Sequence, residues 1–179
     1  MRLMKSLYIA TLIAVVTVSS SVAMAGSQRQ AASLQQLQAL YVQRLVKYIQ
    51  WPQGMGPKPG QPFIVAATDS RSLKPYFTTG NDSARFKLVQ WPAKEYHILI
   101  VNGAPEREAA AILKRTAGQG VLTIGQNPAN LRQGVVINFY LLNGRLKMQV
   151  NPRAANRAGL SISSKLMKLV KVYAGDDDE

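Results

Sequence analysis

The fold class is decided by residues 96–124, which read YHILIVNGAPEREAAAILKRTAGQGVLTI. Tyr96–Val101 and Gly120–Ile124 are nearly continuous apolar runs, a pattern typical of strands that are buried on both faces of a sheet. Between them, Pro105–Ala117 predicts a helix, because its proline lies in the first turn, its glutamates lie near the N-terminus and its basic residues lie near the C-terminus. A strand, a helix and a second strand in this order predict a layered α/β sheet with parallel strands.

The segments before this unit extend the same pattern. Residues 34–50 predict a helix whose apolar positions cover more than half of its circumference, and Trp51-Pro52 ends it because the residue before a proline is disfavoured in the α region. So wide an apolar arc predicts burial on two sides, against the sheet and against a neighbour or a second subunit. Phe63–Thr68 and Arg85–Gln90 predict strands, with a short helix within Ser70–Thr79 between them.

The C-terminal third contains the clearest turn signal. Asn143-Gly144 separates Val135–Leu142 from Arg145–Val150, and this dipeptide predicts a hairpin with a two-residue type I′ turn. The turn fixes the register, which brings apolar residues together on one face of the hairpin. The expected apolar pairs are Leu141 with Leu146, Phe139 with Met148, and Ile137 with Val150.

Two short helices are expected after the hairpin. Asn151-Pro152 supplies an N-cap and a proline at the first helical position for a helix over Arg153–Ala158, which Gly159 ends. Ser163 or Ser164 is expected to cap a last helix, with its apolar residues inward. These inward residues are Leu166, Met167, Leu169 and Val170. The sequence as a whole predicts a single-domain layered α/β sandwich, with a mainly parallel sheet, a C-terminal β-hairpin and flanking helices.

The N-terminus resembles a cleavable secretion signal over residues 1–25. Arg2 and Lys5 supply positive charge, Leu7–Val18 is apolar, and Ala23-Met-Ala25 suits signal peptidase. We therefore expect export, an α/β domain over residues 26–175 and a disordered acidic tail over residues 176–179. The apolar run is too short to span a bilayer comfortably, so the protein is expected to be peripheral to the membrane rather than spanning it, with an uncleaved N-terminal anchor as the alternative.

The charge of the chain is strongly basic, with 22 Lys and Arg against 9 Asp and Glu and a net charge of +13. Such a balance suits acidic protein surfaces, anionic lipid head groups or polysaccharide, whereas nucleic acid is not expected outside the cytoplasm. The basic residues are scattered, so a solvated basic surface is the alternative. The chain contains no cysteine, so an exported protein of this sequence depends on core burial for stability.

The residues that enzymes use are mostly absent. Without cysteine, thiol nucleophiles and cysteine-based metal sites are excluded. The single histidine, His97, lies in an apolar strand, where a hydrogen-bonded core residue is more typical than a base or a ligand. Gly118-Gln-Gly120 lacks the third glycine of a dinucleotide-binding loop, and no serine lies in a nucleophile elbow. Asp69 with Asp82 stays open as an acid/base pair. The sequence thus predicts a binding protein, with no catalytic residue, cofactor or metal ligand.

Four polar residues are candidates for binding a partner. Arg44 falls within the apolar arc of the first helix, where its stem either packs while its guanidinium reaches water, or its charge binds an anionic ligand or a partner carboxylate. Arg153, Asn156 and Arg157 lie on the short helix after the hairpin. The two arginines are four residues apart and share a face, which suits an acidic surface, although a solvated face is the alternative.

Several blocks of sequence bear a family resemblance. Residues 41–52 read YVQRLVKYIQWP, residues 97–101 read HILIV, residues 121–124 read VLTI, and residues 151–166 read NPRAANRAGLSISSKL. Together with Asn138-Phe139 and the Asn-Gly hairpin, these blocks resemble the YfiR/HmsC family of periplasmic regulators. Tyr96 stands where the family usually has cysteine, so the redox-sensitive disulfides of some members cannot form in this chain.

The resemblance implies a function. It implies a regulatory binding protein, tending to form homodimers, that restrains an inner-membrane diguanylate cyclase through the cyclase's periplasmic domain. Cyclic di-GMP and biofilm formation would fall as a result. The alternative that the residues leave open is a periplasmic carrier or sensor of a small anionic ligand.

Overall fold

The computed structural model describes residues 34–78 and 83–175. The chain divides into two compact units, Met1–Gln35 and Gln36–Glu179, and the elements below lie in the second unit, apart from the first residues of the N-terminal helix. The predicted signal peptide, residues 1–25, and the predicted tail, residues 176–179, lie outside the described residues. Within the described ranges, no helix combines the length and apolar character that crossing a bilayer requires.

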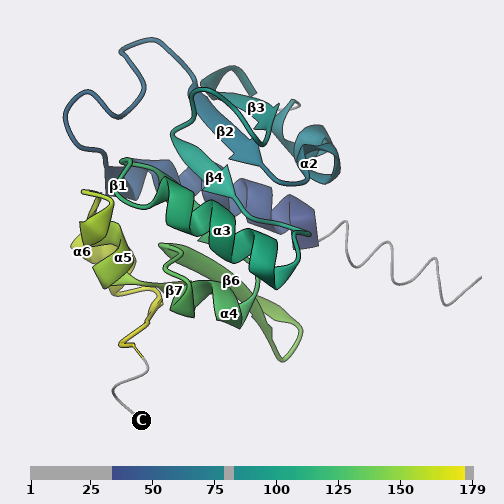
Figure 1. The fold of residues 1–179 in the computed structure, drawn as a ribbon, viewed down its shortest axis with the longest axis vertical. Coiled ribbons are helices and arrows are strands. Elements are labelled where there is room, and N and C mark those ends of the chain that lie inside the picture. Colours follow the sequence, from purple (N-terminus) through teal and green to yellow (C-terminus); the bar gives the residue numbers. More distant parts are fainter. Residues whose placement is uncertain (1–33, 79–82, 176–179) are drawn as a thin grey trace, which may run out of the picture. The chain divides into compact units, whose positions relative to one another are not determined.

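The second unit is built around a mainly parallel sheet (Figure 1). The strands are β1 (Ile49–Gln50), β2 (Phe63–Ala67), β3 (Phe86–Gln90), β4 (Ile98–Ile100), β5 (Leu122–Gly125), β6 (Ile137–Leu142), β7 (Arg145–Val150), β8 (Ser161–Ile162) and β9 (Lys171–Val172). Seven of them form one sheet in the order β3-β2-β4-β5-β6-β7-β9. Only the β6–β7 pair of this sheet is antiparallel. The predicted fold class, a layered α/β fold with a mainly parallel sheet and a C-terminal hairpin, is confirmed.

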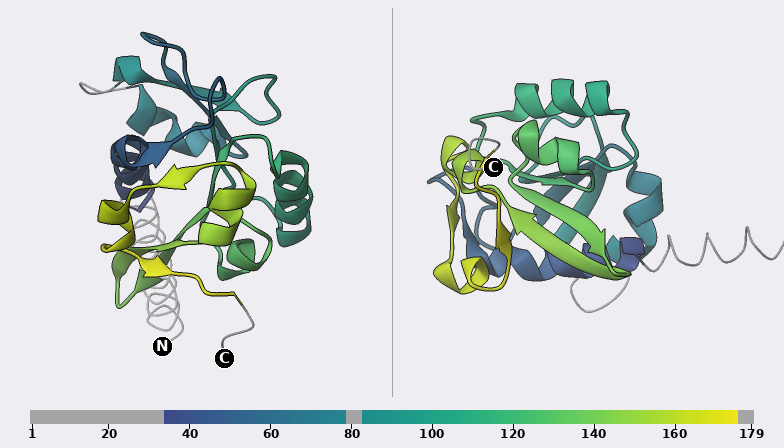
Figure 2. Two further views of the ribbon diagram at one scale, coloured as in Figure 1. Left: turned by 90° about the vertical axis from the view of Figure 1, so that its left-hand side faces the viewer. Right: turned by 90° about the horizontal axis from the view of Figure 1, so that it is seen from below.

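Helices cover both faces of the sheet, so the unit has three layers (Figure 2). One face packs against the N-terminal helix, described over residues 34–45, and against α2 (Ser70–Phe77) and α5 (Pro152–Arg157). The other face packs against α3 (Glu106–Thr116) and α4 (Pro128–Arg132). Buried strands with apolar side chains on both faces require this cover, as the continuous apolar runs predicted.

The N-terminal helix ends earlier than the sequence predicted. The α-helix stops at residue 45, a 3-10 turn follows over Val46–Tyr48, and Ile49 is extended with φ −113° and ψ 132°. Ile49 and Gln50 form β1, which pairs antiparallel with Ile162 and Ser161 of β8. The prediction of a helix to residue 50 is therefore wrong, because extended backbone before Trp51-Pro52 gains a strand partner that is distant in the sequence.

The hairpin and the helix that follows it are as predicted. The β6–β7 register pairs Leu141 with Leu146 and Phe139 with Met148. Asn143 and Gly144 both have positive φ, 51° and 71°, which is the requirement of a type I′ turn. The Oδ1 atom of Asn151 accepts a hydrogen bond from the N–H of Ala154 at 2.9 Å, so this residue caps α5.

The last part of the chain differs from the prediction. The helix α6 spans only Ser164–Met167, with Ser163 as its N-cap, and the chain then forms β9 beside β7. Leu169 lies in this connection and is 78% exposed, so the expectation that it faces inward is wrong. Helical periodicity assigned Leu169 to the core, but the helix has ended before that position.

Candidate functional site

The carboxyl ends of β2 and β4 are where a sheet of this kind offers a ligand crevice, because the chain leaves these neighbours toward opposite sides of the sheet. In this protein Thr68 and Asn102 join the two ends. The N–H of Asn102 donates to Thr68 Oγ1 at 2.8 Å, and the Thr68 hydroxyl donates to the Asn102 carbonyl at 2.6 Å. The amide side chain of Asn102 is buried and bonds to the backbone of Asp69 in both directions, at 3.0 and 3.1 Å. The polar groups at these strand ends therefore bond mainly to one another.

The carboxylate of Asp69 belongs to the same network. Its Oδ1 atom accepts from the N–H of Ser72 at 3.4 Å and caps α2. Asp82, the other member of the acid/base pair left open by the sequence, lies outside the described residues. Among the described residues, no group of three or more His, Asp or Glu side chains could hold a metal ion.

An aromatic cluster lies near the amino ends of β2 and β4. The rings of Trp51 and Phe63 lie 5.1 Å apart between centroids, and the edge of His97 meets Phe63 at 6.0 Å with an interplanar angle of 84°. Trp51 Nε1–H donates to the carbonyl of His97 at 3.4 Å. The structure thus brings the Trp51-Pro52 segment against the single histidine, which directly precedes β4.

The imidazole of His97 is buried and hydrogen-bonded, in agreement with the reading of it as a core residue. Its Nδ1 atom accepts from the N–H of Ile64 at 3.0 Å, so that nitrogen is unprotonated and the proton of the neutral ring is on Nε2. Burial lowers the pKa of His97 from its ordinary value, and the nearby charge of Glu95 opposes this only in part. Burial therefore favours the neutral form of this side chain.

A hollow of about 590 Å³ lies beside this histidine. The loop after Trp51 forms one wall, and residues around the starts of β2 and β4 form the others. Its lining residues include two lysines, Lys58 and Lys87, and one carboxylate, Glu95. Such a lining has a net positive charge and suits a small anion.

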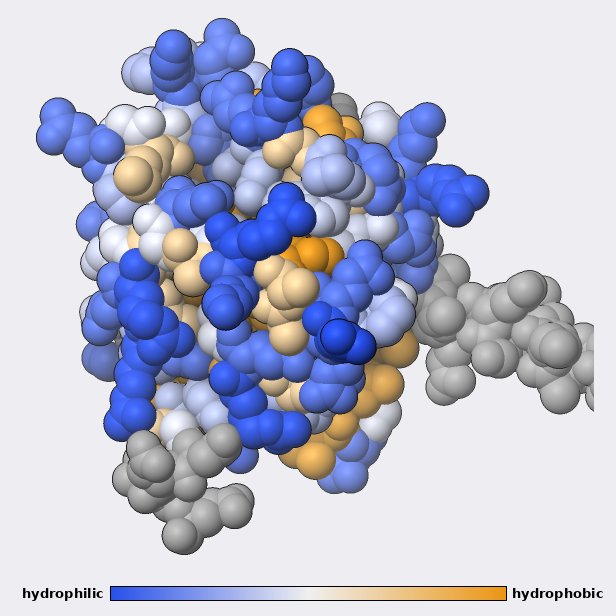
Figure 3. Space-filling model, in the orientation of Figure 1, coloured by the Kyte–Doolittle hydropathy of each residue, from blue (hydrophilic) through white to orange (hydrophobic). Residues whose placement is uncertain are grey.

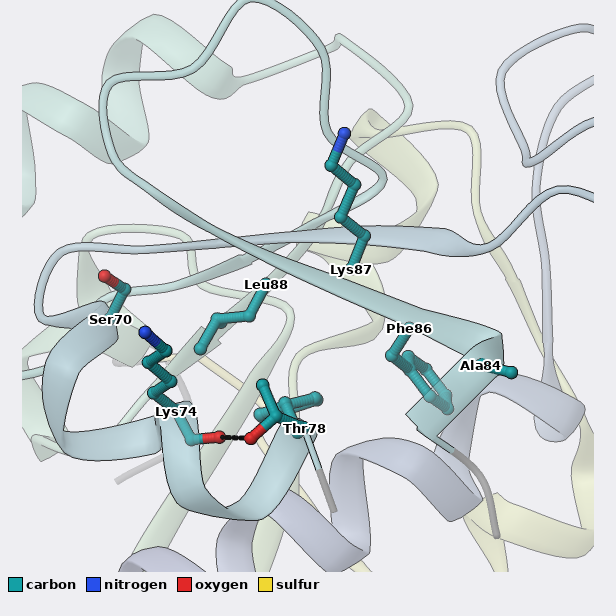
Figure 4. A pocket seen from close by; sticks show the side chains of 8 residues that line it. Ser70, Lys74, Thr78, Ala84, Phe86, Lys87 and Leu88 are labelled. Atoms are coloured by element: carbon teal, nitrogen blue, oxygen red, sulfur yellow. Dashed lines mark hydrogen bonds between the residues drawn. The ribbon is translucent and has the colours of Figure 1, made fainter. Parts of the chain in front are cut away.

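A second hollow, of about 580 Å³, lies between α2 and the edge strand β3 (Figure 4). Its side chains come from both elements, and Figure 4 shows Lys87 pointing away from α2 while Leu88 points toward it. The Thr78 hydroxyl donates to the Lys74 carbonyl at 2.8 Å, so the end of α2 uses its own polar group. The hollow is open and shallow, with a mixed lining that indicates no particular ligand.

The structure does not gather the four predicted partner-binding residues into one site. Arg44 is exposed on the N-terminal helix, whereas Arg153, Asn156 and Arg157 are exposed on α5. The two arginines of α5 extend to different neighbours. A methyl group on Gly134 would lie 3.3 Å from Arg157 Nη2, and a methyl group on Gly175 would lie 3.1 Å from Arg153 Nη1. The shared helix face predicted from their spacing therefore consists of two separate cationic positions.

A cluster of buried amides was missed by sequence reasoning. Asn138 of β6 is 1% exposed, and neither its Nδ2 nor its Oδ1 atom has a hydrogen-bond partner. It lies opposite Gly125 of β5, where a methyl group would come within 2.9 Å of Asn138 Oδ1 and 2.8 Å of Asn130 Oδ1. The group is too tightly packed to admit a ligand. The signal that could have found it is an asparagine within an otherwise apolar strand.

Comparison with known proteins adds a family to this geometry. A family model described as YfiR/HmsC-like matches residues 35–171. The chain belongs to the YfiR/HmsC-like family. Membership makes it one of a family of periplasmic proteins with a regulatory role in cyclic di-GMP signalling. A comparison with curated proteins found no match.

A solved structure supports the fold alone. The ABC domain from Streptococcus pneumonia in complex with L-Trp superposes with a TM-score of 0.53 at 9% identity. The superposition covers 73% of this chain and 59% of the other, so the YfiR/HmsC-like chain spans about three fifths of that domain. The similarity shows a shared fold alone, a mainly parallel sheet covered by helices.

The structure also explains why distant blocks of the YfiR/HmsC-like sequence occur together. The YVQRLVKYIQWP block and the HILIV block meet where Trp51 contacts the carbonyl of His97. The closing block positions α5 through Asn151, whose Nδ2 also donates to the carbonyl of Leu131 at 3.3 Å. Trp51 is half-buried and Asn151 is buried, so these blocks maintain the fold on which the surface residues are placed.

Proposed function

We infer that this chain is a periplasmic regulatory binding protein that restrains an inner-membrane diguanylate cyclase through the cyclase's periplasmic domain. Lower cyclic di-GMP and less biofilm would follow. The observation that carries the proposal is the YfiR/HmsC-like match over residues 35–171, which covers nearly the whole domain. The polar groups at the carboxyl ends of β2 and β4 bond to one another through Asn102, which is consistent with a protein that acts through its surface.

The proposed contact surface includes the exposed arginines of α5 and Arg44 of the N-terminal helix. Arg153, Asn156 and Arg157 lie in a chain with a net charge of +13, which favours an acidic partner. Arginine also binds carboxylates through two parallel hydrogen bonds, which gives orientation as well as attraction. The proposal assigns the α5 arginines to recognition and steering.

The experiment has a genetic arm and a binding arm. Deleting the gene should raise cyclic di-GMP and biofilm, and the wild-type gene should restore both. Binding of the mature protein to the detergent-solubilised cyclase should weaken as salt rises, because the Debye length is about 8 Å at physiological ionic strength. Unchanged cyclic di-GMP in the deletion strain would overturn the proposed function.

The surface is tested with Arg153→Glu/Arg157→Glu beside a charge-matched control, Arg71→Glu/Lys74→Glu. The control residues are exposed on α2, which packs on β3 at the edge of the sheet opposite β9. The α5 variant should lose binding at low salt while the α2 variant retains it. If both bind like wild type and remain folded, the exposed apolar positions of the N-terminal helix become the next candidate interface.

A second candidate function, sensing of a small anionic ligand, is favoured by the hollow beside His97. Lys58 and Lys87 line it together with one carboxylate, Glu95. A ligand should raise the melting temperature of wild type, and Lys58→Gln/Lys87→Gln should remove that shift. We also infer that the protein forms a homodimer, which light scattering of the mature protein measures directly.

A further inference from the structure

The tip of the β6–β7 hairpin exposes two adjacent leucines. Leu141 is 52% exposed and Leu142 is 50% exposed, directly before the Asn143-Gly144 turn. Figure 3 shows hydrophobic surface gathered where Figure 1 places the end of this hairpin. Exposed leucines scattered singly are ordinary, but a pair at a projecting turn, next to further exposed apolar residues, indicates a contact surface.

The two leucines point to opposite faces of the hairpin, because successive residues of a strand alternate. Leu141 pairs with Leu146 on the face that contains Phe139, whereas Leu142 pairs with Arg145 on the other face. A flat protein surface laid on one face would cover one leucine and leave the other in water. A medium that surrounds the tip covers both.

The residues around the tip match a lipid surface. Arg145 and Lys147 of β7 are exposed on the same face as Leu142, where Lys147 lies opposite Tyr140. Long cationic side chains can keep their charges among lipid phosphates while their stems cover apolar surface, and tyrosine is enriched at the boundary between acyl chains and water. This face of the hairpin thus has an apolar tip and, behind it, an aromatic and cationic band.

The opposite face adds apolar surface behind Leu141. Tyr41 of the N-terminal helix is 40% exposed, and its ring lies 5.9 Å from that of Phe139. Arg44 is exposed further along the same helix, and Lys47 is exposed in the 3-10 turn that follows it. Positive charge therefore flanks the apolar strip on both of the elements that form it, in a chain whose net charge is +13.

We propose that the β6–β7 hairpin tip inserts Leu141 and Leu142 into the head-group boundary of an anionic membrane, with Arg145 and Lys147 on the lipid phosphates. Two leucines and a few cations give weak, reversible attachment, because stable anchoring needs more buried apolar area. Such attachment would keep the protein close to the membrane surface. The inference needs no cyclase and is independent of the proposed function.

The test is flotation of the mature protein, residues 26–179, with vesicles of phosphatidylethanolamine and phosphatidylglycerol, beside vesicles of phosphatidylcholine alone. Wild type should float with the anionic vesicles and be released by salt. Leu141→Ser/Leu142→Ser should weaken the apparent affinity for the vesicles by about tenfold or more. Each leucine is half-exposed in the free protein, and serine would no longer bury that apolar surface in the membrane. Arg145→Gln/Lys147→Gln should lower binding to anionic vesicles by a similar factor.

The matched control is Leu169→Ser. Leu169 is the more exposed leucine, at 78%, but it precedes β9, which pairs with Gln149 and Val150 at the end of β7 away from the turn. Its substitution should leave vesicle binding unchanged, and all variants are checked for wild-type circular dichroism and melting temperature. A Leu142→Trp variant should gain a blue-shifted emission that brominated lipid quenches.

Three outcomes would overturn the proposal. Wild type that stays with the soluble fraction shows no membrane attachment. Equal binding by Leu141→Ser/Leu142→Ser and wild type shows that the tip is not the attachment point. Loss of a dimer in light scattering of that variant, with vesicle binding unchanged, assigns the two leucines to an interface between copies of this chain.

Discussion

Protonation of His97 should destabilise the folded protein, because the imidazole uses Nδ1 to accept a backbone hydrogen bond. The N–H of Ile64 donates to that atom at 3.0 Å. A protonated ring has no acceptor, so the N–H of Ile64 would lose its partner in a half-buried place. A buried donor left without a partner costs about 1–3 kcal/mol, and the buried charge adds to that cost.

The direction of the pH dependence follows from the lowered pKa of His97, which burial causes. At pH 8 the imidazole is neutral in both the folded and the unfolded chain, so the histidine contributes no pH dependence to the stability there. As the pH falls through the ordinary histidine value of about 6.5, the unfolded chain takes up a proton first and is stabilised. The free energy of unfolding should therefore fall below that pH, until the folded chain is protonated as well.

The assay is simple because the chain contains one histidine. Its imidazole signals in an NMR titration belong to His97 without ambiguity, and urea unfolding at several pH values gives the stability. The variant His97→Gln offers an oxygen acceptor that does not titrate, so it should lose most of the pH dependence between about pH 7.5 and about pH 5.5. A titration midpoint at or above about 6.5, or an unchanged pH dependence in His97→Gln, would refute the reasoning.

Other substitutions test individual features of the fold through urea unfolding. Gly144→Val should cost about 1 kcal/mol or more. Gly144 has φ 71° and no atom lies within 4 Å of an added Cβ, so this cost is backbone strain, and an unchanged urea midpoint would contradict the type I′ turn. Gly125→Ala should cost about 1–3 kcal/mol from crowding against Asn130 and Asn138. Gly56→Ala should cost less, because its added Cβ would lie 3.2 Å from Trp51 Cβ. Asn151→Ala should cost about 2 kcal/mol, by loss of the α5 cap and of the bond to the Leu131 carbonyl, and Asn151→Asp should recover part of the loss.

The order of elements could be predicted because each depends on local chemistry. The buried runs around β4 and β5, the charge pattern of α3 and the Asn-Gly turn all act within a few residues of themselves. The helix α4 has an equally local signal that was overlooked. Asn127-Pro128 begins it with an N-cap and a proline, the same combination that Asn151-Pro152 supplies to α5.

The elements that could not be predicted depend on partners distant in the sequence. Ile49 is extended because β8 pairs with it, and Lys171–Val172 is a strand because β7 offers a free edge. Both segments are two residues long, too short for periodicity to indicate them. Sequence reasoning extended the neighbouring helices through these positions, and this is how Leu169 was assigned to the core.

The candidate surfaces show the same division between local and distant causes. The spacing of Arg153 and Arg157 correctly placed both side chains on an exposed helix, but the guanidinium groups lie near different glycines, Gly175 and Gly134. The hairpin is the opposite case. Its register alone places Leu142 beside Arg145 at a turn, and no helix of the described residues buries either leucine of the tip. The Asn-Gly turn and the register can therefore be read from the sequence, and the structure adds only that the tip is exposed. For this reason the hairpin tip is a firmer basis for an interaction surface than the α5 arginines.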